Sequence, residues 1–299
     1  MELKGIIPAM LTPLTVEQKV NESVTRQLTN HLLDSGVHGL FILGTNGEFH
    51  LFNTEEKLQF ARIVIEETNG RVPVIVGTGG NSTEETIDLS QKMEQLGADA
   101  LSLITPFFIS PTQEEMAVHF EKVAESTSLP VLLYNIPART GVNIEPETVA
   151  RLAKVRNIVG IKDSSGNFAN IENYINATKD EDFSVFAGTD SLILPTLQAG
   201  GKGAVAATAN MIPDVVIAIY NNWLEGNMEA AEKNQGKLEP LRETFKHGTL
   251  PSVLKKAVEL YSVPVGPPKM PVSEVSGDAL KIVTEMVELY KHQKVSIDK

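Results

Sequence analysis

The chain has 299 residues, of which 42% are hydrophobic, and its formal net charge of −12 without a cluster of Lys and Arg disfavours a nucleic-acid partner. No apolar run approaches the roughly 18 residues of a membrane span, and the first residues lack the features of a signal peptide, so we expect a cytoplasmic protein with no membrane partner. The absence of Cys excludes disulfides and thiol catalysis, and the six scattered His residues predict no metal site.

Short apolar runs alternate with helical patterns through the first two thirds of the chain. Eight such runs are predicted as strands: Gly5–Met10, Gly39–Leu43, Val72–Gly77, Ala100–Ile104, Pro130–Tyr134, Ile158–Ile161, Phe183–Ala187 and Gly203–Ala207. Eight strands that alternate with helices are typical of an α/β protein of the (β/α)8 TIM-barrel class. A doubly wound open sheet is the main competitor, but it normally has fewer strands and the G-x-G-x-x-G motif after its first strand is absent here.

Helix signals fill the intervals between these strands. Asn21, a favoured N-cap residue, precedes a stretch with apolar residues on one face. Ser82 with Glu85, and Thr112 with Glu115, have the spacing of a capping box. We interpret the apolar stripes of these helices as packing surfaces rather than as functional features.

The strand signal stops after about Ile212. Four helices are predicted beyond it: Pro213–Glu225, Asn227–Lys246, Leu250–Tyr261 and Ser276–Lys291. The segment 262–269 is rich in Pro and Gly and is predicted to be a stiff connector. We therefore expect a catalytic barrel over residues 1–212 and a helical extension over residues 213–299 that packs on the barrel.

Lys162 directly follows the apolar run Ile158–Ile161, where an ionisable amine needs an explanation. Burial removes the hydration of an ammonium and favours the neutral amine, which can condense with a carbonyl to form a Schiff base. The alternative is that Lys162 is only the first solvated residue after the strand, perhaps paired with Asp163.

Polar residues also follow neighbouring strands. In the loop Gly44–Glu48, the backbone N–H groups and the Thr45 hydroxyl can converge on a small anion such as a carboxylate. Tyr134 ends the fifth strand and can relay protons, while Arg139 can grip a carboxylate through two hydrogen bonds. Each has an ordinary alternative: a turn, a structural hydroxyl or a surface charge. Because barrel enzymes build their sites at the C-terminal strand ends, the coincidence with Lys162 favours a shared site.

Four motifs, in this order, resemble the dihydrodipicolinate synthase/N-acetylneuraminate lyase family. They are G-T-N-G-E at Gly44–Glu48, Y-N-I-P-x-R-T at Tyr134–Thr140, G-I-K-D at Gly160–Asp163 and A-G-T-D at Ala187–Asp190. The resemblance covers essentially the whole chain. It implies a (β/α)8 barrel with C-terminal helices and a class I, Schiff-base aldolase chemistry.

The resemblance also implies roles for individual residues. Lys162 is expected to form the Schiff base with C2 of pyruvate or another 2-oxo acid, and Tyr134 to shuttle protons. The hydroxyl of Thr45 and nearby amides, including that of Asn46, are expected to hold the carboxylate. The protonated imine withdraws electrons, so a C3 proton becomes acidic and the resulting enamine attacks an aldehyde.

Three further positions match the lining of the family's pocket. The main chain of Gly188 and of Val205 is expected to line it, and Arg139 to stand at its mouth and assist the second substrate. Members of the family need no metal or organic cofactor and are usually homotetramers built as dimers of dimers. We therefore expect no cofactor and a homotetramer whose substrates are pyruvate, or a 2-oxo acid, and an aldehyde.

Departures from the family's patterns bear on the substrate. Lysine-pathway synthases typically carry T-T where this chain has Thr45-Asn46, and a tyrosine where it has Phe108, which cannot relay a proton. Thr54 and Lys57 replace the His residues of lysine-inhibited synthases. The segment Gly266–Lys269 looks more like that of 2-keto-3-deoxy sugar acid aldolases.

We therefore favour a 2-keto-3-deoxy sugar acid aldolase, with dihydrodipicolinate synthase (4-hydroxy-tetrahydrodipicolinate synthase) as the alternative. A catalytically idle barrel with a binding or regulatory role is a distant third possibility. It would be favoured by loss of Lys162 or Tyr134, and both are present.

Overall fold

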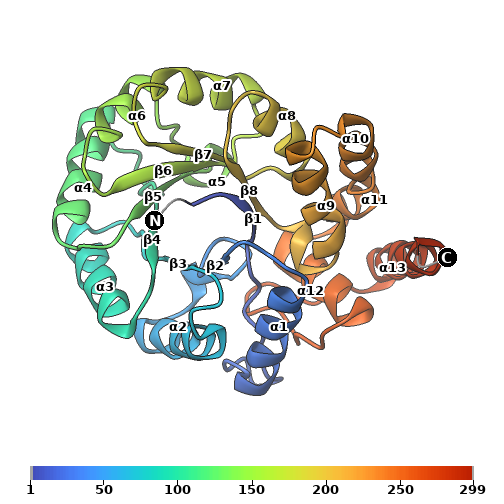
Figure 1. Cartoon of the computed structure of the whole chain (residues 1–299). Helices are drawn as coiled ribbons and strands as arrows, with labels where there is room; N and C mark the ends of the chain where they lie inside the picture. Colours follow the sequence, from blue (N-terminus) through green and yellow to red (C-terminus); the bar gives the residue numbers. More distant parts are fainter. Residues whose placement is uncertain (1–2, 298–299) are drawn as a thin grey trace.

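The computed structural model describes residues 3–297 and contains one eight-stranded parallel sheet. The strands are β1 (Gly5–Pro8), β2 (Leu40–Ile42), β3 (Val74–Gly77), β4 (Ala100–Ile104), β5 (Val131–Asn135), β6 (Ile158–Asp163), β7 (Ser184–Ala187) and β8 (Gly203–Ala206). Each overlaps one of the eight predicted runs, although β5 continues to Asn135 and β6 to Asp163, beyond the predicted ends at Tyr134 and Ile161. Figure 1 shows the strands around a common centre with helices outside. The predicted TIM-barrel fold is confirmed.

The sheet closes on itself between its first two strands. Its order is β1-β8-β7-β6-β5-β4-β3-β2, so β1 and β2 are its two ends. A parallel bridge joins Ala9 to Phe41, and the backbone N–H of Met10 donates to the Phe41 carbonyl at 2.9 Å. Just before β2, the N–H of His38 donates to the carbonyl of Ile6 in β1 at 2.9 Å. These contacts complete the barrel, which leaves no long open strand edge.

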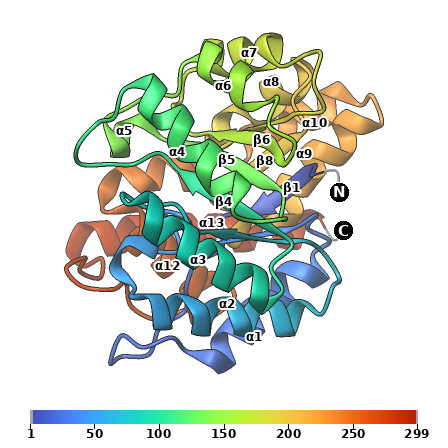
Figure 2. The ribbon, with the colours of Figure 1, turned by 90° about the vertical axis from the view of Figure 1, so that its left-hand side faces the viewer.

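Helices connect successive strands and cover the outside of the barrel, as Figures 1 and 2 show. They are α1 (Glu22–Asp34), α2 (Thr54–Thr68), α3 (Thr83–Leu96), α4 (Gln113–Glu125), α5 (Pro137–Thr140), α6 (Pro146–Leu152), α7 (Phe168–Ala177), α8 (Ile193–Gln198) and α9 (Pro213–Leu224). Short 3-10 helices are η1 (Phe49–Leu51), η2 (Asp190–Leu192) and η3 (Thr208–Asn210). All strand residues except Val159 are buried, because a parallel sheet covered by helices has apolar contacts on both faces.

The predicted N-caps form at the expected residues. The Asn21 side chain accepts from the N–H of Val24, and the Ser82 side chain accepts from that of Glu85. The return bond from Glu85 that would complete a capping box with Ser82 is not formed, so that pair is an N-cap only. Thr112 makes both bonds of a capping box with Glu115. These bonds satisfy N–H groups that a helix start otherwise leaves without partners.

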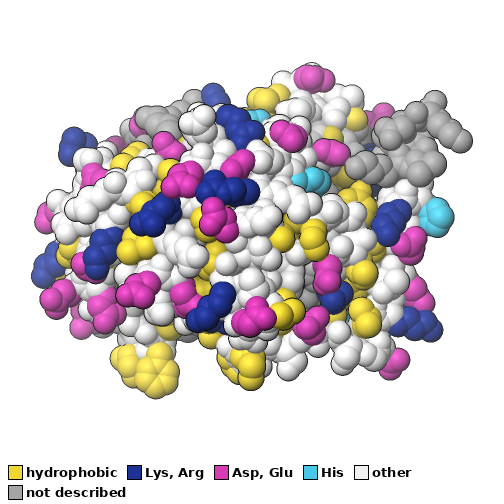
Figure 3. Space-filling model, turned by 90° about the horizontal axis from the view of Figure 1, so that it is seen from below, with side chains coloured by type: hydrophobic (Ala, Val, Ile, Leu, Met, Phe, Trp, Pro, Cys, Tyr) yellow, Lys and Arg dark blue, Asp and Glu magenta, His cyan; other side chains and the backbone are white. Residues whose placement is uncertain are grey.

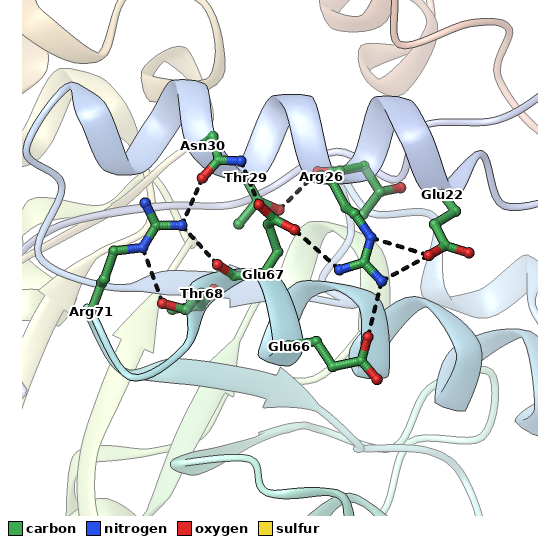
Figure 4. A network of polar contacts seen from close by, with 9 residues as sticks. Glu22, Arg26, Thr29, Asn30, Glu66, Glu67, Thr68 and Arg71 are labelled. Atoms are coloured by element: carbon green, nitrogen blue, oxygen red, sulfur yellow. Dashed lines mark hydrogen bonds and ion pairs between the residues drawn. The ribbon is translucent and has the colours of Figure 1, made fainter.

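Polar contacts join the first two outer helices, as Figure 4 shows. The Arg26 guanidinium on α1 pairs with Glu22 on the same helix and with Glu66 and Glu67 on α2, at 2.7, 2.9 and 3.1 Å. Asn30 on α1 donates to Glu67 at 2.5 Å. The arrangement fixes the pairing of α1 and α2 at a partly exposed surface, where each ion pair alone contributes little.

The C-terminal part consists of α10 (Met228–Gly236), α11 (Glu239–Thr244), the 3-10 helix η4 (Phe245–His247), α12 (Leu250–Tyr261) and α13 (Gly277–Ile297). The prediction of one helix over Asn227–Lys246 is wrong, because the chain breaks between α10 and α11. Pro240 has no N–H to donate to the carbonyl of Gly236, and its ring clashes with a helical carbonyl four residues back. The connector 262–269 forms no helix or strand, and its stiffness stays a prediction.

Helix α9 follows β8 and contacts β1, so it takes the place of the barrel's eighth helix. Figure 1 shows α10, α11 and α13 outside the ring, beyond α9. The division into a barrel of residues 1–212 and an extension of residues 213–299 stays a prediction. Within the described residues, no helix has the length and apolar character needed to cross a bilayer.

Candidate active site

A cavity of about 520 Å³ opens at the C-terminal ends of the strands. All seven predicted site residues line it: Thr45, Asn46, Tyr134, Arg139, Lys162, Gly188 and Val205. They come from five different strands or the loops after them, separated by up to 160 positions in the sequence. The structure therefore brings together the residues that the motifs singled out; their chemical roles remain predictions at this stage.

Lys162 is the penultimate residue of β6 and is only 4% exposed. It pairs in register with Tyr134 on β5, and its Nζ lies 4.0 Å from the centre of the Tyr134 ring and 4.6 Å from that of Phe41. Among the described side chains, none forms an ion pair with Lys162. The amine thus projects into the cavity between aromatic rings, which is the setting that a Schiff-base lysine needs.

Asp163 does not neutralise this lysine. Successive strand residues point to opposite faces, so Asp163 turns away from the barrel interior. Its carboxylate accepts hydrogen bonds from Asn135 at 2.7 Å, Asn170 at 2.9 Å and Ser165 at 2.6 Å. Burial raises the pKa of Asp163, and these bonds oppose the rise. The alternative of a solvated Lys162–Asp163 pair is therefore wrong.

Tyr134 and Thr45 form a hydroxyl pair beside the amine. The oxygens of the two side chains lie 3.0 Å apart, and either hydroxyl can donate. Tyr134 is 3% exposed, whereas Thr45 is half-buried at the cavity wall. A proton can therefore pass between these hydroxyls, with Tyr134 next to the lysine and Thr45 nearer the opening.

The loop that carries Thr45 is held tightly against the barrel. A Cβ on Gly44 would come within 2.6 Å of the Phe41 ring, so only glycine fits there without a shift. The carbonyl of Gly47 accepts a hydrogen bond from the Thr12 hydroxyl at 2.8 Å. Asn46, between Gly44 and Gly47 in the sequence, is 7% exposed and lines the cavity. The loop thus offers a hydroxyl and backbone amides at a fixed place.

Gly188 and Val205, from the ends of β7 and β8, also line the cavity. The N–H of Gly188 donates to the Asp163 carbonyl at 2.7 Å, and its own carbonyl accepts from the Ser164 hydroxyl at 3.2 Å. Val205 lies in β8 and is 1% exposed. Asp190, in the same A-G-T-D motif, accepts from the N–H of Thr208 at 2.7 Å, which ties the end of β7 to the end of β8.

Arg139 is an exposed residue of the short helix α5 and lines the cavity, where a charged group of a substrate can reach it. His50, in η1, lines the same edge. Within the described residues, no group of three His, Asp or Glu side chains has the arrangement of a metal site.

No sequence pattern predicts that the C-terminal part reaches this cavity. Arg242 on α11, Phe245 on η4, and Thr249 and Leu250 at the start of α12 all line it. Glu48 belongs to the G-T-N-G-E motif but had no predicted role, although it too lines the cavity. No spacing rule could find these residues, because their contacts join positions about 200 residues apart.

A buried amine at the C-terminal end of a barrel strand, beside a tyrosine that can exchange protons with a threonine, is the arrangement of class I aldolases. Comparison with known proteins agrees with that class. The model of the dihydrodipicolinate synthetase family matches residues 2–289, and the chain belongs to this family. It is accordingly a carbon–carbon lyase of the class I, pyruvate-dependent aldolase type.

Two relatives and one solved structure illustrate the similarity. A 4-hydroxy-tetrahydrodipicolinate synthase 1 from Halalkalibacterium halodurans is 42% identical, over 93% of this chain and 94% of its own. A 4-hydroxy-tetrahydrodipicolinate synthase from Methanopyrus kandleri is 39% identical, over 94% of each chain. YagE of E. coli K12, a prophage protein of the family solved in complex with pyruvate, is 34% identical with a TM-score of 0.93, over 97% of this chain and 99% of its own.

Proposed function

We propose that Lys162 forms a Schiff base with C2 of pyruvate. Its Nζ attacks the carbonyl carbon, and the carbonyl oxygen leaves as water after two proton transfers. Loss of a C3 proton from the protonated imine gives an enamine, C3 then bonds to the carbonyl carbon of an aldehyde, and water releases the product. The observation that carries this proposal is the amine of Lys162, buried beside the Tyr134–Thr45 hydroxyl pair.

Tyr134 supplies and removes the protons of these steps. Its hydroxyl is held by Thr45 at 3.0 Å and its ring lies against the amine of Lys162. The Thr45 hydroxyl and the amide of Asn46 bind the pyruvate carboxylate, which points C2 toward the lysine. Gly188 and Val205 line the same cavity, where their main chain would contact the bound pyruvate, and Arg139 would receive the second substrate at the mouth.

For the aldehyde, we propose aspartate semialdehyde, which makes the reaction that of 4-hydroxy-tetrahydrodipicolinate synthase. The relatives described above carry that name at 39–42% identity, which favours the alternative over the sugar acid aldolase that the sequence patterns favoured. A 2-keto-3-deoxy sugar acid aldolase remains the second candidate because of Phe108. This residue is 92% exposed and has no hydroxyl, so it adds nothing to the Tyr134–Thr45 proton route.

Borohydride reduction in the presence of pyruvate tests the covalent step. Intact and peptide mass spectrometry should show the reduced pyruvate adduct on Lys162, and Lys162→Ala should show none. An adduct absent from the unmodified protein, or found on another lysine, would contradict the mechanism.

The choice of aldehyde is tested separately, by comparing kcat/KM for condensation of pyruvate with aspartate semialdehyde against cleavage of 2-keto-3-deoxygluconate. We expect preference for the semialdehyde. A clear preference for the sugar acid would instead establish the second candidate, and it would leave the role of Lys162 unaffected.

A further inference from the structure

Glu48 closes the loop that carries Thr45, and it is an unusual residue for its place. Its side chain is 1% exposed, and its backbone has φ 58° and ψ 29°, in the left-handed region. A residue with a Cβ rarely adopts that conformation unless its surroundings hold it there. The side-chain contacts of Glu48 supply this hold.

Both carboxylate oxygens of Glu48 are held by the C-terminal part of the chain. Oε2 pairs with Nζ of Lys255 on α12 at 2.5 Å, and Oε1 accepts from the backbone N–H of Lys269 at 2.7 Å. The Lys255 side chain is also 1% exposed, and its Nζ donates to the Pro267 carbonyl at 2.9 Å. A loop after the second strand is thus fixed by residues more than 200 positions later.

The buried charges of Glu48 and Lys255 compensate each other. Burial lowers the pKa of Lys255, and the negative charge of Glu48 opposes this. A buried ion pair seldom stabilises a fold more than apolar residues of the same volume would, and its best-attested use is to specify one arrangement of the chain. The arrangement that this pair specifies is the position of the Gly44–Glu48 loop relative to α12.

Lys269 makes a second contact between the C-terminal part and the residues around η1. Lys269 pairs with Glu56, in the first turn of α2, at 2.6 Å, and its Nζ lies 4.3 Å from the centre of the Phe52 ring. The residues on either side of η1 are therefore both attached to the connector that leaves α12. We call residues 265–269 the strap.

The loop transmits this attachment to the site. The N–H of Glu48 donates to the Thr45 carbonyl at 3.1 Å, and the Thr45 hydroxyl meets that of Tyr134 at 3.0 Å. A shift of Glu48 therefore moves the hydroxyl and amides that are proposed to bind a carboxylate. Misplacement of a binding group by about 1 Å can cost on the order of 100-fold in rate.

We propose that Glu48 and Lys255 are positioning residues for pyruvate: the ion pair uses α12 and the strap to hold the Thr45–Asn46 loop in its carboxylate-binding form. The inference rests on the proposed function, because it presupposes that this loop binds the pyruvate carboxylate. According to this proposal, helix α12 contributes to pyruvate binding although it supplies no reacting group.

The proposal is tested by trapping the adduct with borohydride over a range of pyruvate concentrations and measuring it by intact mass. Two quantities are compared between variants: the pyruvate concentration that gives half-maximal adduct, and the maximal amount of adduct. The double variant Glu48→Gln/Lys255→Met removes both charges, so neither is left buried alone. We expect the half-saturating concentration to rise by about 10-fold or more while the maximal adduct is preserved. An unchanged value in the folded variant would overturn the inference.

Glu48→Asp is the second variant, in case the double variant does not fold. Asp tolerates the left-handed backbone and keeps the charge, but its carboxylate lies one methylene further from Lys255. It should raise the half-saturating concentration by at least about 3-fold, from the same misplacement. No change in this variant would equally contradict the proposal.

Tyr290→Phe is the matched control. The Tyr290 hydroxyl donates to the Lys237 carbonyl at 2.5 Å and accepts from the N–H of Leu241 at 3.3 Å, so its loss weakens the packing of α13 without touching Glu48. It should lower the melting temperature and leave the half-saturating concentration unchanged. If it raises that concentration as much as the double variant does, the effect is general destabilisation and the inference fails.

These outcomes separate the inference from the proposed function. If the unmodified protein forms the adduct and the Glu48 variants saturate like it, only the positioning role is refuted. If the unmodified protein forms no adduct, the proposed function is refuted and the positioning role falls with it.

Discussion

At the scale of single residues, the site depends on which face of a strand each side chain takes. Lys162 and Asp163 are neighbours, yet one enters the cavity between aromatic rings and the other bonds to Asn135 and Asn170 outside the barrel. A shift of one position in β6 would exchange them. The register Tyr134↔Lys162 therefore determines that the amine, and not a carboxylate, meets the tyrosine.

Tyr134→Phe removes the hydroxyl proposed to move protons and leaves the ring that packs on Lys162. We expect kcat to fall by roughly 10²-fold or more, as for the loss of a general acid–base group. Steady-state kinetics with pyruvate and the aldehyde measures it. Tyr174→Phe is the control, because the Tyr174 hydroxyl donates to the Ile144 carbonyl away from the cavity. Equal losses in both variants would contradict a proton-transfer role for Tyr134.

Gly188→Ala tests how closely the cavity wall is packed. The added Cβ would lie 2.1 Å from the Ser164 hydroxyl oxygen and 2.8 Å from the Asp163 carbonyl oxygen. We expect a loss of about 1–3 kcal/mol in unfolding free energy, measured by urea denaturation. Adding Ser164→Ala should recover part of this loss, because the side-chain clash disappears and the backbone clash stays. Stability equal to that of the unmodified protein would show that the residues around Gly188 shift to accommodate the added methyl group.

At the scale of elements, α3 and α4 meet at a buried histidine. Nδ1 of His119 on α4 lies 2.9 Å from the Thr83 hydroxyl on α3, and the side chain packs against Phe120. Burial lowers the pKa of His119 below its ordinary value of 6.5. The unfolded chain therefore binds a proton near pH 6.5 that the folded chain resists, so His119 costs stability as the pH falls below about 6.5.

His119→Asn should make this loss of stability shallower, because Asn keeps a polar atom for Thr83 and does not titrate. One histidine can contribute at most about 1.4 kcal/mol per pH unit. Urea denaturation at pH 7.5 and about pH 5.5 measures the difference. Burial also lowers the pKa of His38, so part of the pH dependence should persist. An identical slope in the variant would show that His119 takes up its proton freely in the folded state.

The helices after the barrel show why an element can be predicted correctly while its role is missed. The range Leu250–Tyr261 agrees with α12, including its ends. Its apolar stripe predicts that it packs on something, but not on which face of the barrel. Only its placement beside the Gly44–Glu48 loop reveals that Lys255 has a buried carboxylate as its partner.

At the scale of the whole molecule, the homotetramer implied by the family resemblance stays a prediction. Phe108 and Ile109, in the loop after β4, are 92% and 74% exposed, and such neighbouring apolar side chains favour an interface. In the view of Figure 3, hydrophobic side chains also protrude at the lower edge, while Lys and Arg alternate with Asp and Glu over the rest of that face.

Light scattering during size-exclusion chromatography should therefore give four times the chain mass of 32.5 kDa. Phe108→Asp/Ile109→Asp should lower that mass, because charges would be buried at the interface. Leu224→Asp, which also changes an exposed apolar residue, is the matched control for a surface outside this loop. A monomer for the unmodified protein would refute the tetramer.

The sequence by itself determined the strands and the chemical types at their ends. Strand and helix patterns are local, and a parallel barrel gathers the C-terminal ends of its strands at one face. The sequence therefore predicts that Lys162, Tyr134 and Thr45 lie in one site, and all three line the cavity. Only the tertiary structure decided the burial of Lys162, the outward turn of Asp163 and the attachment of Glu48 to Lys255. The physical reason is that these contacts join different elements: the register of β5 against β6 sets the faces of Lys162 and Asp163, and the packing of α12 beside the Gly44–Glu48 loop sets the pairing of Glu48 with Lys255.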